Sequence, residues 1–152
     1  MPATDTLSIG VVLERRPARS KWIDFVWSAV AVLPGEPDLP AWSEISTDCY
    51  FAGMTTVDLH RADTATYRDN LASGDPRMWV RCRMDGARPA VIAVTADPAE
   101  GEAFTEAGDD LVDSVPMPAE VAAALAAFVA EHHVERAFIK RKRDRGFVED
   151  DE

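Results

Sequence analysis

Side chains alternate in character along Trp22 to Leu33 (WIDFVWSAVAVL), and this alternation constrains the fold more than any other feature. Polar or smaller positions at Asp24, Val26 and Ser28 separate apolar residues that recur at every second position. The apolar set is Ile23, Phe25, Trp27, Ala29, Ala31 and Leu33. Successive side chains of a strand point to opposite faces, so a period of two predicts a β-strand with one face in the core.

Several other segments also have strand character. They are rich in β-branched residues or alternate with the same period, and they are 7–13, 49–60, 78–84, 89–95 and 111–115. Gly53 interrupts the second of them and predicts a bulge or a hairpin. Asp85-Gly86 is a hairpin turn signal, so the strands on either side of it should pair antiparallel.

Three segments predict helices. Asp63 is a candidate N-cap for a short helix through Leu71, and Asp97-Pro98 opens a second short helix. Pro118 opens the clearest one, whose apolar face carries Val121, Leu125, Phe128, Val129 and His132. We therefore expect an α+β fold: a mostly antiparallel sheet with two short helices and one longer C-terminal helix. A small barrel closed by the last helix is the alternative architecture.

Length and composition favour one domain. The chain has 152 residues, of which 47% are apolar, so it can bury a core without disulfides or metals. We expect one domain over 1–137, followed by a basic and then acidic tail over 138–152. Cys49 and Cys82 are far apart, so buried thiols are favoured over a disulfide. Residues 1–6 lack signal-peptide character and no stretch is long enough to span a membrane, so a cytoplasmic protein is expected.

Charge is the most informative functional feature. The net charge is −11, which disfavours nucleic-acid binding by the domain as a whole. Two segments are nonetheless basic, and we interpret them as candidate binding segments. They contain Arg15, Arg16, Arg19 and Lys21, and then Lys140, Arg141, Lys142, Arg143 and Arg145. Every charged residue from Asp97 to Glu135 is acidic, so the basic end either folds back on this acidic stretch or grips a partner.

Catalytic motifs are absent from the sequence. It contains no glycine-rich phosphate loop, no nucleophile elbow and no zinc-type spacing, so we expect no catalytic residue, metal or cofactor that a motif would mark. Asp58 and His60 lie two apart on an expected strand and form a possible acid–base pair, or simply a polar strand face. Trp22 and Trp79 fall opposite the expected core, where they mark a partner site or lie beneath helices.

A set of short strings resembles a known family. The strings are VVLERRP (11–17) with Trp22 and Trp27, VAVLPG (30–35), LHR (59–61), YRDNL (67–71), VPMP (115–118), HHVE (132–135) and FIKRKRD (138–144). Together they resemble the proteobacterial family called domain of unknown function 3305, over nearly the whole chain. The resemblance implies no activity or catalytic residues. It does imply a genomic context, because such proteins are typically encoded beside molybdenum- or tungsten-dependent formate dehydrogenases and their maturation factors.

Three functional hypotheses follow. The first is a non-catalytic accessory or adaptor protein of a formate dehydrogenase system, which docks through its basic segments on an enzyme subunit or maturation factor. The second is a protein that binds a pterin nucleotide cofactor, whose phosphates would pair with Lys140, Arg141 or Arg143. The third is a small enzyme that uses the Asp58 and His60 pair.

Overall fold

The computed structural model describes residues 3–19, 21–22, 25–106 and 108–148, with side chains up to His133. The fold is α+β, as expected, and its strands pair antiparallel. The strands are β1 (Asp5–Pro17), β2 (Phe25–Pro34), β3 (Ser43–Ser46), β4 (Cys49–Leu59), β5 (Arg77–Asp85), β6 (Arg88–Thr95) and β7 (Leu111–Pro116). The helices are α1 (Thr64–Leu71), α2 (Pro98–Thr105) and α3 (Ala119–Val148), and a 3₁₀ turn (Arg61–Asp63) precedes α1.

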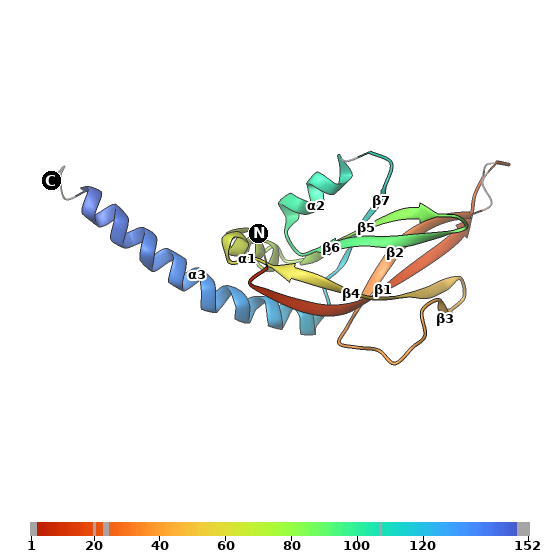
Figure 1. Cartoon of the computed structure of the whole chain (residues 1–152), viewed down its shortest axis with the longest axis horizontal. Helices are drawn as coiled ribbons and strands as arrows, with labels where there is room; N and C mark the ends of the chain where they lie inside the picture. Colours follow the sequence, from red (N-terminus) through yellow and green to blue (C-terminus); the bar gives the residue numbers. More distant parts are fainter. Residues whose placement is uncertain (1–2, 20, 23–24, 107, 149–152) are drawn as a thin grey trace.

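The strands form two sheets rather than the single closed barrel of the alternative architecture. One sheet has the order β2-β1-β4-β3 and the other the order β6-β5-β7. The two sheets face each other around a shared core (Figure 1). Their edges are also linked, because the amide of Ala29 on β2 donates to the carboxylate of Asp113 on β7 over 2.9 Å. This hydrogen bond joins the β2 edge of one sheet to the β7 edge of the other.

A β-bulge changes the buried face of β2. Val12 pairs with Ala31 and Leu13 pairs with Ala29, so Val30 has no partner in the ladder. Because an extra residue shifts the alternation by one position, Val32 becomes buried beyond the bulge. Trp27 and Ala29 are buried as the alternation predicts, but the extension of that pattern was wrong: Ala31 and Leu33 are half-buried and Phe25 is exposed. Ile23, which the alternation also predicts to be buried, lies outside the described residues.

Gly53 marks a second bulge, as the sequence predicts. The register between β1 and β4 shifts where Val11 pairs with Gly53 and Val12 pairs with Phe51. Gly53 has a φ of 113°, which L-residues with side chains rarely adopt. The extra residues of the two bulges, Val30 on β2 and Ala52 on β4, lie opposite neighbouring positions of β1, so both strands bend beside its middle.

Helices α1 and α3 cover one end of the core. Val121 and Leu125 of α3 are buried, and the rings of Tyr67 on α1 and Phe128 on α3 meet with centroids 6.1 Å apart. The apolar face predicted for the C-terminal helix is therefore confirmed over its described side chains. Tyr67 is fully buried whereas Leu71 is only half-buried, so the predicted pair shares the face unequally.

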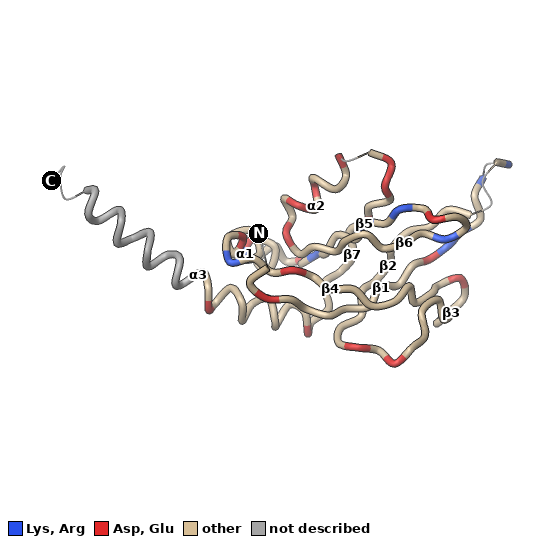
Figure 2. The backbone as a smooth tube through the Cα atoms, viewed as in Figure 1, with Lys and Arg blue, Asp and Glu red and all other residues tan. Residues whose placement is uncertain are grey.

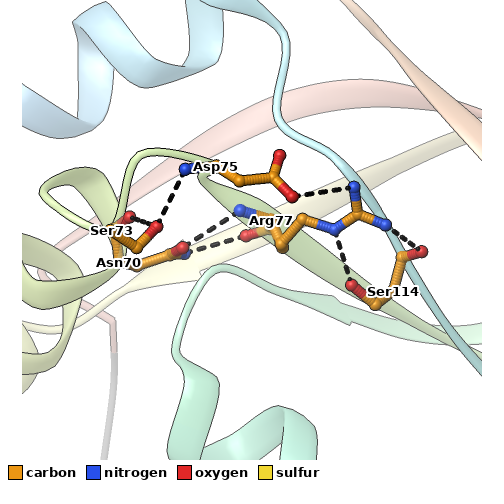
Figure 3. A network of polar contacts seen from close by, with 5 residues as sticks. All are labelled: Asn70, Ser73, Asp75, Arg77 and Ser114. Atoms are coloured by element: carbon orange, nitrogen blue, oxygen red, sulfur yellow. Dashed lines mark hydrogen bonds and ion pairs between the residues drawn. The ribbon is translucent and has the colours of Figure 1, made fainter.

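A polar network connects the end of α1 to the second sheet (Figure 3). The buried Asn70 side chain donates to the carbonyls of Arg77 (2.8 Å) and Ala96 (2.9 Å) and accepts from the amide of Arg77 (3.0 Å). Arg77 in turn donates to the hydroxyl of Ser114 (2.8 Å) and to its carbonyl (2.9 Å). The Asn70 side chain thus satisfies backbone groups on β5 and just after β6, which fixes α1 relative to the sheet.

Helix α2 covers the outer face of the second sheet. It begins as predicted, because the Asp97 carboxylate accepts a hydrogen bond from the Ala99 amide over 2.9 Å. Gly101 lies so close to the ring of Trp79 that a Cβ at this position would overlap the ring. Trp79 is therefore a packing residue beneath a helix rather than an exposed aromatic side chain.

Candidate binding pocket and basic hairpin end

The first predicted basic segment lies at the end of the hairpin formed by β1 and β2 (Figure 2). Arg16, Arg19 and Lys21 of this segment are exposed, and so is Trp22, which follows it. We call these four residues the basic hairpin end. Trp22 is 84% exposed, and the Lys21 ammonium lies 5.6 Å from the centre of its ring. The exposed ring of Trp22 thus lies at a hairpin end with three exposed cations, of which Arg16 also pairs with Glu14 over 3.6 Å.

Arg15 belongs to the same predicted segment but lies in a different environment. Its Nε donates to the Asp48 carboxylate over 3.1 Å, and its backbone amide donates to the Asp48 carbonyl over 2.9 Å. The guanidinium lies 4.4 Å from the ring centre of Phe25 and 5.3 Å from that of Tyr50. Both contacts are within the range of a cation–π interaction, so Arg15 is held against aromatic rings.

These rings border a cavity of about 550 Å³, which we call the aromatic–arginine pocket. The buried ring of Trp27 meets Trp42 edge-on at 5.7 Å and Tyr50 at 5.8 Å. Met84 and Ala87, at the turn between β5 and β6, complete the wall on the side of the second sheet. The pocket is therefore formed where the ends of both sheets come together.

A second cation reaches the pocket from the second sheet. The guanidinium of the exposed Arg88 lies 4.5 Å from the ring centre of Trp42. Among the described side chains no carboxylate forms an ion pair with Arg88, whereas Arg15 is paired with Asp48. In an acidic protein, the pocket thus combines aromatic faces with two guanidinium groups, only one of which has a counter-ion.

Two other arginines of the second sheet share one carboxylate. Arg81 Nε lies 2.6 Å from the Asp110 carboxylate, and Arg83 donates to the same carboxylate over 2.9 and 3.0 Å. The hydrogen bonds from Arg83 and then Arg81 lower the pKa of Asp110 to about 2. This contact is structural, since it ties β5 to the segment before β7, and both cations pair with the same carboxylate.

Local structure explains how the aromatic residues of the pocket meet. Trp42 precedes β3 and has a φ of 70°, and its amide donates to the carbonyl of Phe51 across the β3–β4 hairpin. Its neighbour Ser43 pairs with Phe51, so the hairpin brings Trp42 beside Tyr50. Sequence reasoning missed Trp42, Tyr50 and Arg88 because they belong to three separate segments with no common spacing. The Pro-rich stretch before Trp42 was the only available signal, and it indicates only a loop.

Asp58 and His60 lie at a second, smaller cavity of about 250 Å³ between β4, β6 and α2, together with Glu100. Asp58 is exposed and His60 is half-buried, and among the described residues no hydrogen bond joins their side chains. The His60 backbone amide donates to the Tyr67 hydroxyl over 3.0 Å, and burial raises the pKa of that hydroxyl to about 12. The arrangement lacks the carboxylate–imidazole contact that would orient a general base.

The histidines of α3 have structural contacts where the structure describes them. The ring of His133 lies 3.3 Å from the Thr64 hydroxyl and 3.0 Å from a guanidinium nitrogen of Arg68, so it links α3 to α1. Across the described side chains, no group of three or more histidine, cysteine, aspartate or glutamate residues is arranged to hold a metal ion. The second predicted basic segment, Lys140 to Arg145, lies outside the described side chains.

The two cysteines carry free thiols in different environments. Cys49 is half-buried and Cys82 is buried, and both are free cysteines. None of the helices in the described part of the chain combines the length and apolar character that crossing a membrane requires.

Comparison with known proteins gave one match. A family model described as "Protein of unknown function (DUF3305)" matches residues 8–143, a range that includes both sheets and the pocket. No curated protein and no solved structure gave a significant match.

Proposed function

Because this chain belongs to the DUF3305 family, whose description assigns no function, we propose a function from its own surface: a non-catalytic accessory protein that docks on an acidic partner through its basic hairpin end. The docking surface contains Arg16, Arg19, Lys21 and Trp22. This is the adaptor function expected from the sequence, and its first proposed contact is the basic hairpin end.

The single observation that supports docking is the exposure of Trp22 among three cations. Tryptophan and arginine are the residues most often found at the energetic centres of protein interfaces. A partner surface with carboxylates around an apolar depression would complement both kinds of side chain. The chain as a whole, with the basic hairpin end included, carries a net charge of −11, so such a partner would be repelled from other faces and steered toward this end.

The partner that we propose is a formate dehydrogenase subunit or one of its maturation factors. The family's expected genomic neighbourhood motivates this choice, and the contact chemistry requires only that the partner be acidic. We extend the proposal to Lys140, Arg141 and Lys142, with Arg143 and Arg145, as a second contact of the same sign.

The experiment measures binding of the purified chain to purified formate dehydrogenase subunits and maturation factors by biolayer interferometry, at low and high salt. The test variant replaces Arg16, Arg19 and Lys21 with serine. The matched control adds three glutamates at the exposed helix positions Ala103, Ala123 and Ala130, which changes the net charge by the same amount. Trp22→Ala tests the apolar part of the contact separately.

We expect the hairpin variant to bind on the order of tenfold more weakly and to lose most of its salt dependence, while the control stays within about twofold of wild type. Equal losses in both variants would mean that only net charge matters, which would contradict a localised docking surface. Absence of binding to every component at low salt would refute the proposed partner.

A further inference from the structure

We propose that the aromatic–arginine pocket is a small-molecule site for a flat aromatic ring that carries an anionic group, a phosphate or a carboxylate. This goes beyond docking through the basic hairpin end, because it assigns a ligand to a separate cavity. The pocket volume of about 550 Å³ falls within the range typical of small-molecule sites.

The charge of the pocket selects an anion. Arg15 and Arg88 enter it from different sheets, and Asp48 is the only carboxylate that forms an ion pair with either of them among the described residues. A cationic ligand would be repelled by the unpaired Arg88. An anion would gain charge-assisted hydrogen bonds from the same group, and a phosphate or carboxylate matches the planar donor edge of a guanidinium.

The aromatic rings of the pocket favour a flat ligand. Each guanidinium lies over an aromatic ring, Arg15 over Phe25 at 4.4 Å and Arg88 over Trp42 at 4.5 Å. A guanidinium over a ring keeps the in-plane N–H groups accessible to a ligand while its face is covered. Trp42 and Tyr50 are only half-buried, with ring centres 6.4 Å apart, so the parts of both rings that Arg88 and Arg15 do not cover can stack on a ligand.

The ion pair between Arg15 and Asp48 predicts how the pocket responds to mutation. A bound anion competes with the Asp48 carboxylate for Arg15, so removing that negative charge should strengthen binding. Asp48 has a φ of 59°, a conformation that asparagine tolerates well. Asp48→Asn is therefore a variant that keeps the backbone and is expected to bind more tightly, a result that misfolding cannot produce.

The test is a titration of the isolated full chain, followed by tryptophan fluorescence and calorimetry. The probes are guanosine 5′-monophosphate for the phosphate class, 1-naphthoate for the carboxylate class, and guanosine and inorganic phosphate as the separate parts. We expect one of the two anionic rings to bind at submillimolar concentration and its parts to bind roughly tenfold more weakly or worse.

Three variants make the assignment specific. Arg88→Gln should weaken binding of the anionic ring roughly ten- to hundredfold, and Asp48→Asn should strengthen it severalfold. Arg61→Gln, an exposed arginine outside the pocket, should leave it unchanged. Failure of both anionic rings to bind at millimolar concentration overturns the proposal, and so does binding of guanosine as tight as that of its monophosphate. The titration contains no partner protein, so neither of these results tests docking through the basic hairpin end. That proposal is tested separately by the interferometry experiment.

Discussion

Replacing Asn70 with alanine should destabilise the domain more than any single surface change. Asn70 is 5% exposed, and its amide makes three hydrogen bonds to backbone groups of Arg77 and Ala96. Alanine removes all three contacts and leaves behind two carbonyl oxygens and one amide. Helix α1 would then lose its polar connection to the second sheet.

The expected magnitude follows from where those groups lie. The Ala96 carbonyl is in a buried contact and would stay unsatisfied, which costs about 1–3 kcal/mol. The two groups of Arg77 are partly accessible to water, so each loss should cost roughly 0.5–1 kcal/mol. The sum is about 3 kcal/mol, a large part of a typical domain stability of roughly 5–15 kcal/mol. For a chain of this length it corresponds to a Tm lower by roughly 6–12 °C.

Urea denaturation followed by circular dichroism measures this change directly. Asn70→Asp provides an isosteric comparison, because it keeps the acceptor for the Arg77 amide but replaces both donated bonds with a carboxylate facing carbonyls. It should be at least as destabilising as alanine. Asp69→Ala, at the exposed neighbouring position, should change stability by less than about 0.5 kcal/mol. A loss below about 1 kcal/mol for Asn70→Ala would refute the reasoning that the network anchors α1.

Three further predictions concern packing, thiol access and pH. Gly101→Ala should lower stability by about 1–3 kcal/mol despite alanine's better helix propensity, because the new Cβ overlaps the Trp79 ring. A thermal melt measures the loss, and adding Trp79→Leu to the same chain should recover part of it. Burial raises the pKa of the Cys82 thiol to about 12. A thiol reagent should therefore label Cys49 first in the native protein and Cys82 only on unfolding. Equal labelling rates of the two thiols in the native protein would contradict the burial of Cys82. The pKa of Asp110 is lowered to about 2, so its pairing with Arg81 and Arg83 should stabilise the fold fully above about pH 4 and be lost as the pH falls toward 2. Asp110→Asn should remove that part of an acid-unfolding curve, and an unchanged curve would contradict the pairing.

The elements themselves were largely predictable from local patterns. Alternation predicted β2 and β5, the Asp97-Pro98 start predicted the capped helix α2, and Gly53 predicted a bulge. The short strand β3 was missed because four residues are too few to show a period. The prediction of which β2 residues are buried beyond Ala29 was also wrong. A bulge arises from the pairing of two strands, so the sequence of one strand does not show it.

The candidate site was predicted only in part. Arg15 belongs to a basic segment of the sequence, but nothing in that segment separates its ring-covered guanidinium from the exposed Arg16. That difference arises from Asp48 and Tyr50, which belong to another hairpin. Arg88 has no basic neighbours in its own segment, so a search for charge runs passes over it.

The sequence alone therefore determined the periodic elements, the fold class, the acidic balance and the basic segment, since each depends on neighbours along one chain. The tertiary structure decided which aromatic rings and which two guanidinium groups share a pocket. Such contacts join residues from both sheets, and their distances depend on register, bulges and hairpin geometry rather than on spacing in the sequence.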